Sequence, residues 1–179
     1  NLADVAAYYY NTDLRTSTPA NAADATGTCT SPAGDDLCAN NLVSSGRDVA
    51  KTQHMTTFTL GLGAQGKMIY APQINKDYWQ DTSGDFFSVA NRKTAGVPDN
   101  SVCSWQSSGA CYWPTPASDS NANIDDLWHA AINGHGTYFS ASDAPSLAES
   151  LTGALGEIVK TPRAGTAAAA ASSNPNVTT

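Results

Sequence analysis

Apolar residues recur at helical spacing in three stretches of the chain and in strand-like runs in two others. The spacing of Leu127, Ala130 and Ile132 predicts an amphipathic helix, which two closely spaced glycines at 134 and 136 end. The run at 53–63 is rich in β-branched, aromatic and leucine residues, which is typical of a buried strand in a parallel sheet. The predicted elements are helices over 2–14, 124–133 and 146–159 and strands over 54–62 and 137–141.

The first and last of these helices carry apolar stripes that predict packing against a core. Asp143 is expected to cap the last helix, whose first turn tolerates Pro145. The predicted core-facing residues are Leu2, Val5, Ala6, Tyr9 and Tyr10 in the first helix, and Leu147, Leu151, Ala154, Leu155, Ile158 and Val159 in the last.

The strand at 54–62, the helix at 124–133 and the strand at 137–141 form a βαβ unit. Such a unit places its two strands parallel, with a right-handed connection. Two strands leave most of the sheet uncovered and one edge unpaired, so the remaining strands are expected to come from elsewhere. The predicted fold class is α/β, as part of a larger layered sheet. Because the chain begins at Asn1 inside a predicted helix, it is interpreted as a portion of a longer precursor.

Two long segments interrupt the periodic pattern and read as insertions, at about 16–52 and 64–123. Both are rich in Gly, Pro, Ser, Asn, Asp and Thr. Residues 161–179 are rich in Ala, Ser and Pro and are typical of a linker. The second insertion also contains aromatic residues, which favour a packed subdomain or a contact surface over a disordered linker. The predicted contact residues are Trp79, Phe86, Phe87, Trp105, Tyr112 and Trp113.

Four cysteines lie in the insertions as two close pairs, Cys29 with Cys38 and Cys103 with Cys111. Three pairings are possible, and the local one is favoured because each bridge would then close a short loop. A zinc site would need closer cysteine spacing or nearby histidines, which neither pair has. Disulfides indicate an oxidising compartment, such as the periplasm or the cell exterior.

Charge and hydropathy exclude two classes of partner. The chain has 9 Lys and Arg against 16 Asp and Glu, for a net charge of −7, and no basic cluster that could neutralise phosphates. Nucleic acid is therefore not an expected partner. No apolar run approaches the roughly 20 residues that cross a bilayer, so no membrane span is predicted.

Three segments together resemble the PilY-type tip adhesins of bacterial type IV pili, in the C-terminal half of their von Willebrand factor A domain. The segments are LADVAAYYYNTDLR at 2–15, QHMTTFTLGLG at 53–63 and IDDLWHAAINGHG at 124–136, and the likeness extends through 138–143 and the Ala-rich linker. Roughly 70 to 80 residues carry the resemblance, and the two cysteine-bearing insertions do not. His135 also departs from the relatives, which often have Arg there.

The resemblance implies a doubly wound α/β sheet, with residues 1–160 as the C-terminal part of the domain and a β-propeller beyond the linker. It implies export to the cell surface and a role in pilus assembly, adhesion and surface sensing. The implied partners are minor pilins or pilus tip proteins, the rest of the precursor, and a host or abiotic surface. A divalent metal is implied for the complete domain, but its Asp-x-Ser-x-Ser loop does not occur here, so no metal ligand and no cofactor are assigned.

Other candidate chemistry is outweighed by simpler roles. Asp125, Asp126 and His129 share one helical turn, but a helix cap and a packed histidine explain them without a metal. Residues 119–126 resemble a calcium loop without its Gly and Glu, so a turn is favoured. Gly61, Gly63 and Gly66 outline a dinucleotide fingerprint with no clear helix after them.

Two alternatives to a non-enzymatic adhesin remain open. A secreted α/β hydrolase would need a nucleophile, and Ser140, Ser142 and Asp143 lack the Gly-x-Ser-x-Gly elbow that would support one. A purely structural pilus component, whose insertions pack on minor pilins, would differ from an adhesin in not binding surfaces.

Overall fold

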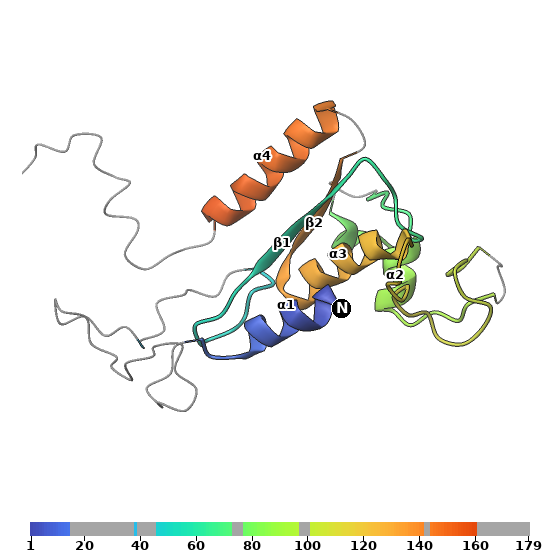
Figure 1. Ribbon diagram of the computed structural model, residues 1–179, viewed down its shortest axis with the longest axis horizontal. Helices are drawn as coiled ribbons and strands as arrows, with labels where there is room; N and C mark the ends of the chain where they lie inside the picture. Colours follow the sequence, from blue (N-terminus) through green and yellow to red (C-terminus); the bar gives the residue numbers. More distant parts are fainter. Residues whose placement is uncertain (15–37, 39–45, 73–76, 97–100, 142–143, 161–179) are drawn as a thin grey trace, which may run out of the picture.

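A two-stranded parallel sheet lies between two layers of helices (Figure 1). The computed structural model describes residues 1–14, 38, 46–72, 77–96, 101–141 and 144–160. The elements in chain order are α1 (Leu2–Asn11), β1 (Thr57–Leu62), the 3-10 turn η2 (Tyr78–Gln80), α2 (Asp85–Ala90), α3 (Ala122–Asn133), β2 (His135–Ala141) and α4 (Ala144–Lys160). Helices α1 and α3 pack together on one side of the sheet, and α4 packs on the other, mainly over β2.

The parallel pairing of β1 with β2 confirms the prediction from the βαβ pattern. The register runs from Thr57 opposite His135 to Leu62 opposite Ala141, with one irregularity after Thr57. Helix α3 connects the two strands and contacts both. The small parallel sheet and its helices therefore agree with the α/β class, within the described part of the chain.

Strand β1 is less buried than predicted. Of its six residues, Gly61 alone is buried, and Leu62 is exposed. The reason is its position, because β1 has a neighbouring strand on one side and α4 covers chiefly the other strand. The prediction of a fully buried strand is wrong for the described residues.

The face that α1 presents to the core also differs from the prediction. The buried residues are Ala3, Ala6 and Tyr10, while Leu2 and Val5 are exposed. Two alanines allow α1 to approach α3 closely, with Ala130 between them in one small buried cluster. The larger side chains of the predicted stripe consequently lie beside this contact and not within it.

Tyr10 anchors the end of α1 to the segment before β1. Its hydroxyl donates to Asp48 Oδ1 (3.2 Å) and accepts from the backbone N–H groups of Val49 (2.9 Å) and Ala50 (3.1 Å). His54 Nε2 lies 2.8 Å from Asp48 Oδ1 but is not aligned for a hydrogen bond. The Tyr10 ring also stacks on His135, with 3.7 Å between ring centroids.

The predicted apolar stripe of α4 is covered in part. Helix α4 meets the sheet through Ser150, whose hydroxyl donates to the Ser140 carbonyl (3.2 Å), and through Gly153, which lies against Phe139. Leu151, Leu155 and Val159 are exposed. The expected cap at Asp143 and the linker at 161–179 lie outside the described residues.

Candidate contact surface

The two ends of the second insertion meet at one buried carboxylate, that of Asp125. Asp125, on the first turn of α3, accepts hydrogen bonds from the backbone N–H groups of Lys67 (2.7 Å) and Met68 (3.1 Å). Gly66 passes so close to this carboxylate that any side chain there would collide with it. Helix α3 starts at Ala122, and Asn121 provides no side-chain cap. The predicted capping role of Asp125 or Asp126 is therefore wrong, because both carboxylates bind other segments.

Aromatic side chains from the insertion and from the βαβ unit form the main core. Trp128 of α3 stacks on Phe86 and on Tyr138 of β2, with ring centroids 5.6 and 5.3 Å apart. Tyr70 and Tyr78 meet the indole ring edge to face, each at 5.2 Å. We call this the aromatic core, and it consists of Tyr70, Tyr78, Phe86, Trp128 and Tyr138.

Two tyrosines of the aromatic core also satisfy the backbone of β2. The Tyr78 hydroxyl accepts from the N–H of Tyr138 (3.1 Å), and the Tyr70 hydroxyl donates to the carbonyl of the same residue (3.4 Å). Burial raises the pKa of Tyr78 to about 12 and also raises the pKa of Tyr70. Both hydroxyls therefore stay protonated at neutral pH.

The six predicted contact residues separate into buried and accessible members. Phe86 is 6% exposed and belongs to the aromatic core, so its prediction as a contact residue is wrong. Trp79 is 39% exposed and Tyr112 is 55% exposed, while Phe87, Trp105 and Trp113 are half-buried. These accessible aromatic residues are carried by segments that pack on the aromatic core.

Arg47 and Asp77 fix the orientation of Trp79. Asp77 accepts from the Trp79 backbone N–H (3.1 Å), and it binds Arg47 Nη2 through both carboxylate oxygens (2.8 and 2.9 Å). The Arg47 guanidinium lies 4.8 Å from the centre of the indole ring, within cation–π range. An open groove of about 560 Å³ adjoins this pair, and its lining also includes Asn11 and His135.

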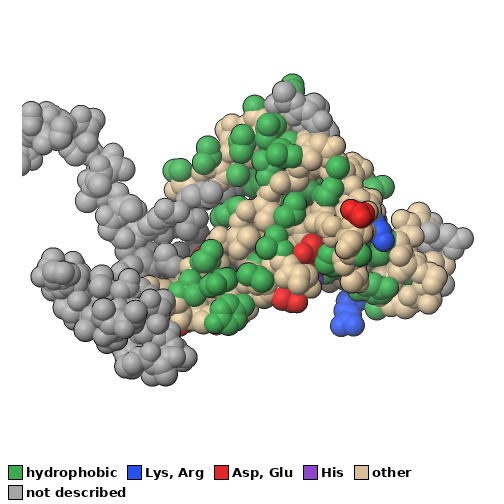
Figure 2. All heavy atoms as spheres, viewed as in Figure 1, with side chains coloured by type: hydrophobic (Ala, Val, Ile, Leu, Met, Phe, Trp, Pro, Cys, Tyr) green, Lys and Arg blue, Asp and Glu red, His purple; other side chains and the backbone are tan. Residues whose placement is uncertain are grey.

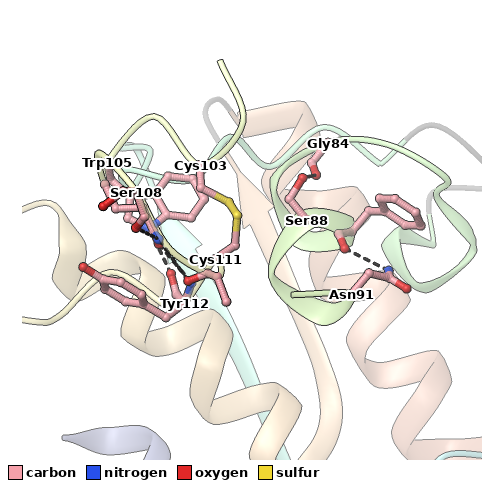
Figure 3. Close-up of a disulfide and its surroundings, with 11 residues drawn as sticks. Gly84, Ser88, Asn91, Cys103, Trp105, Ser108, Cys111 and Tyr112 are labelled. Atoms are coloured by element: carbon pink, nitrogen blue, oxygen red, sulfur yellow. Dashed lines mark hydrogen bonds between the residues drawn. A yellow bond between two sulfur atoms is a disulfide. The ribbon is translucent and has the colours of Figure 1, made fainter. Parts of the chain in front are cut away.

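The disulfide predicted between Cys103 and Cys111 is present and closes the loop that carries Trp105, with Tyr112 directly after it (Figure 3). The Trp105 indole N–H donates to the Tyr112 carbonyl (2.9 Å). The Gln106 side chain bonds both Ala110 O (3.0 Å) and Tyr112 N (3.0 Å). Cys38 is also disulfide-bonded, and its predicted partner Cys29 lies outside the described residues.

The structure brings few of the other candidate groups together. Asp126 accepts from the backbone N–H of Leu2 (2.7 Å), and His129 stacks on Trp113 at 4.6 Å. The described residues contain no group of three or more His, Cys, Asp or Glu that could hold a metal ion. Ser142 and Asp143 lie outside those residues. Asp125 and Asp126 therefore bind the backbone of other segments, Asp125 at Lys67 and Met68 and Asp126 at Leu2. The spacing of the two residues in the sequence did not reveal this role.

Acidic pH is expected to destabilise the fold through His129. Burial lowers its pKa below the ordinary 6.5, and nearby Asp126 and Asp4 offset this in part. The unfolded chain therefore binds more protons than the folded chain just below pH 6.5, so folding stability falls as the pH falls through that value. In urea unfolding at about pH 7 and about pH 5, a His129→Phe variant should lose less stability than the parent.

Asp85 and Asp125 have the opposite effect on how stability depends on pH, because burial raises the pKa of each carboxyl above 3.8. Both are present in the parent and in the His129→Phe variant, so the difference between the two proteins isolates His129. Parallel pH curves for the two proteins would contradict the prediction.

Sequence comparison relates the chain to curated pilus proteins. It is 30% identical over 161 residues to the type IV pilus biogenesis factor PilY1 of Pseudomonas aeruginosa strain UCBPP-PA14, covering 88% of this chain and 12% of that protein. The PilY1 of strain PAK is 29% identical over 113 residues, covering 62% of this chain and 8% of that protein. This is weak homology, and the chain spans about a tenth of these relatives' length. No family model matches the chain. No solved structure matches it significantly.

Proposed function

We propose that this chain works in type IV pilus biogenesis, as a non-enzymatic part of a longer exported protein. The observation that carries the proposal is the match to PilY1 over 161 residues, because these curated relatives are named as pilus biogenesis factors. The Cys103–Cys111 disulfide supports an extracellular or cell-surface location, since such bonds persist in oxidising compartments. Within the described residues, no helix is long and apolar enough to cross a membrane.

The proposed domain is a doubly wound sheet of the von Willebrand factor A type, with residues 1–160 as its C-terminal part. The parallel β1–β2 pair, with α3 on one side and α4 on the other, supports this proposal. A divalent metal would belong to the complete domain.

The proposed contact surface consists of Trp79, Phe87, Trp105, Tyr112 and Trp113, and its targets are pilus tip proteins or a host or abiotic surface. Exposed Trp and Tyr residues with a neighbouring Arg have the composition of binding hot spots. Arg47 lies over the Trp79 ring, and the Cys103–Cys111 disulfide constrains the segment of Trp105 and Tyr112, which lowers the entropy that these three side chains lose on binding.

A double variant, Trp79→Ser with Tyr112→Ser, tests the contact surface in the full-length protein. We expect attachment to surfaces to fall at least about tenfold, as for the loss of hot-spot aromatics, while the number of pili stays unchanged. Val49→Ser is the control, because Val49 is exposed and lies outside the second insertion. Thermal unfolding should verify that the variants fold.

Unchanged attachment in the double variant would contradict the adhesin and favour a purely structural pilus component. One observation favours that second candidate, because Phe86 and its neighbours in the insertion serve the aromatic core. Unchanged pilus number and attachment on deleting the whole protein would contradict the pilus function itself.

A further inference from the structure

The open groove beside Trp79 lies at one end of the sheet, where three elements meet. Helix α1 ends there at Asn11, helix α3 ends at Asn133, and β2 begins at His135. The volume of the groove, about 560 Å³, falls in the range of small-ligand sites. Its other lining residues are Ala7, Arg47, Trp79 and Ile132.

Three side chains of the groove each present a hydrogen-bond acceptor and are anchored through their donor. Asn11 Nδ2 donates to a carbonyl of its own helix (2.8 Å), and Asn133 Nδ2 donates to the Ala3 carbonyl (3.2 Å). His135 Nδ1 lies 2.7 Å from the Arg47 carbonyl, which can only accept, so Nδ1 carries a proton and Nε2 is the acceptor of the neutral ring. The two amide oxygens and Nε2 have no hydrogen-bond partner in the described part of the chain.

Arg47 supplies hydrogen-bond donors to the same groove. Its Nη2 binds both carboxylate oxygens of Asp77, so the N–H groups of Nε and Nη1 have no partner among the described residues. The guanidinium lies over the indole ring of Trp79, and the exposed part of this ring adds apolar surface. The groove therefore offers acceptors, donors and an aromatic surface side by side.

The charges around the groove disfavour an ionic ligand. The Arg47 guanidinium is paired with Asp77 at 2.8 Å, and the described lining contains no carboxylate that could bind a cation. The C-terminal ends of α1 and α3 carry partial negative charge, which disfavours an anion. A neutral ligand is therefore favoured.

The groove also differs from the apolar surfaces of the molecule. Figure 2 shows apolar side chains gathered over α1 and along α4 and the strands. In the groove, a wholly apolar ligand would cover the amide oxygens of Asn11 and Asn133 and Nε2 of His135 without giving them a hydrogen bond, which is unfavourable. The ligand must therefore carry several donor groups as well as an apolar face.

We propose that this groove binds a neutral saccharide. Each sugar hydroxyl both donates and accepts, so neighbouring hydroxyls match the three acceptors and the free donors of Arg47. The C–H face of a sugar ring packs on the indole of Trp79, because the face of an aromatic ring is negative. A peptide backbone carries only one donor per residue and matches three acceptors in one groove less well. This inference rests on the proposed contact surface, to which Trp79 belongs, and names its ligand class.

An array of immobilised probes tests the ligand class with the full-length protein. The array should carry neutral oligosaccharides, sialylated and sulfated oligosaccharides, and uncharged peptides. We expect binding to neutral oligosaccharides, and in titrations of the best binder we expect Trp79→Ala and Asn11→Leu each to weaken binding at least about tenfold. Leucine has nearly the shape of asparagine but no acceptor. Binding to the acidic oligosaccharides or the peptides alone, or to no probe, would overturn the proposal.

Asn91→Leu is the matched control. Asn91 is exposed at the end of α2, and its Nδ2 donates to the Phe87 carbonyl (2.9 Å), as Asn11 Nδ2 does within α1 (Figure 3). It does not line the groove, so this variant should bind the oligosaccharide as the parent does. Equal weakening by Asn11→Leu and Asn91→Leu would overturn the proposal. Thermal unfolding should verify that the variants fold.

This test is separate from the test of the contact surface. Binding of an oligosaccharide by the purified protein does not depend on piliation or attachment. If the protein bound no neutral oligosaccharide but the Trp79→Ser, Tyr112→Ser double variant still lost attachment, the saccharide would be refuted and the contact surface would stand.

Discussion

Replacing Trp128 by alanine is expected to lower the free energy of unfolding by about 3–5 kcal/mol, the largest effect of any single substitution considered for this chain. Trp128 is 2% exposed, and its ring contacts every other member of the aromatic core. Alanine would leave a cavity that the insertion and β2 both border, and rigid aromatic neighbours fill such a space poorly. Urea unfolding followed by far-UV circular dichroism measures the loss.

Trp128→Phe is the matched control. The indole N–H of Trp128 has no well-aligned hydrogen-bond partner in the described part of the chain, so phenylalanine removes no such bond and retains an aromatic ring. We expect a loss of about 1–2 kcal/mol, from the smaller ring alone. Equal losses in the two variants would show that ring packing does not determine the stability of this core.

Replacing Asp125 by alanine is expected to cost about 2–3 kcal/mol. The change removes both acceptors of the Lys67 and Met68 N–H groups, and it leaves the buried Met68 N–H without a partner. Burial raises the pKa of Asp125, so part of the gain from these bonds already offsets desolvation of the carboxylate. Chemical unfolding gives the magnitude, and hydrogen exchange at Lys67 and Met68 reports the local effect.

Asp125→Asn provides the intermediate case, because the amide retains one acceptor oxygen and loses the charge. About half of the alanine effect is expected. If the asparagine and alanine variants were both as stable as the parent, the hydrogen bonds from Lys67 and Met68 to Asp125 would not stabilise the fold.

Local patterns predicted the elements of this fold better than their contacts. The composition of the strand-like runs and the helical spacing between them identified a parallel βαβ unit, because composition, periodicity and connection length are properties of the chain itself. The face of α1 was predicted in part, since Ala6 and Tyr10 are buried as expected but Leu2, Val5 and Tyr9 are exposed. Large side chains usually mark the buried side of a helix, but here close approach to α3 selects the alanines.

The candidate contact surface was also predictable only in part, because composition is a local property and burial is not. Aromatic composition pointed to the second insertion, and the spacing of Cys103 and Cys111 indicated their local bridge. Composition does not distinguish a supporting ring such as Phe86 from an accessible one such as Trp79, because burial depends on residues distant in sequence. The roles of Trp128 and Asp125 were missed for the same reason. Asp125 binds Lys67, about 60 residues away in the chain, and Trp128 stacks on Phe86 of another element.

The bonds from Asp125 to Lys67 and Met68 bring the entry and the exit of the second insertion together at one point beside α3. A segment whose two ends are already tethered can change in length at little cost, since doubling a loop adds only about 0.6 kcal/mol of closure entropy. The scaffold is thus suited to evolutionary diversification at this position. Homologous proteins could exchange the whole insertion without rebuilding the framework beneath it.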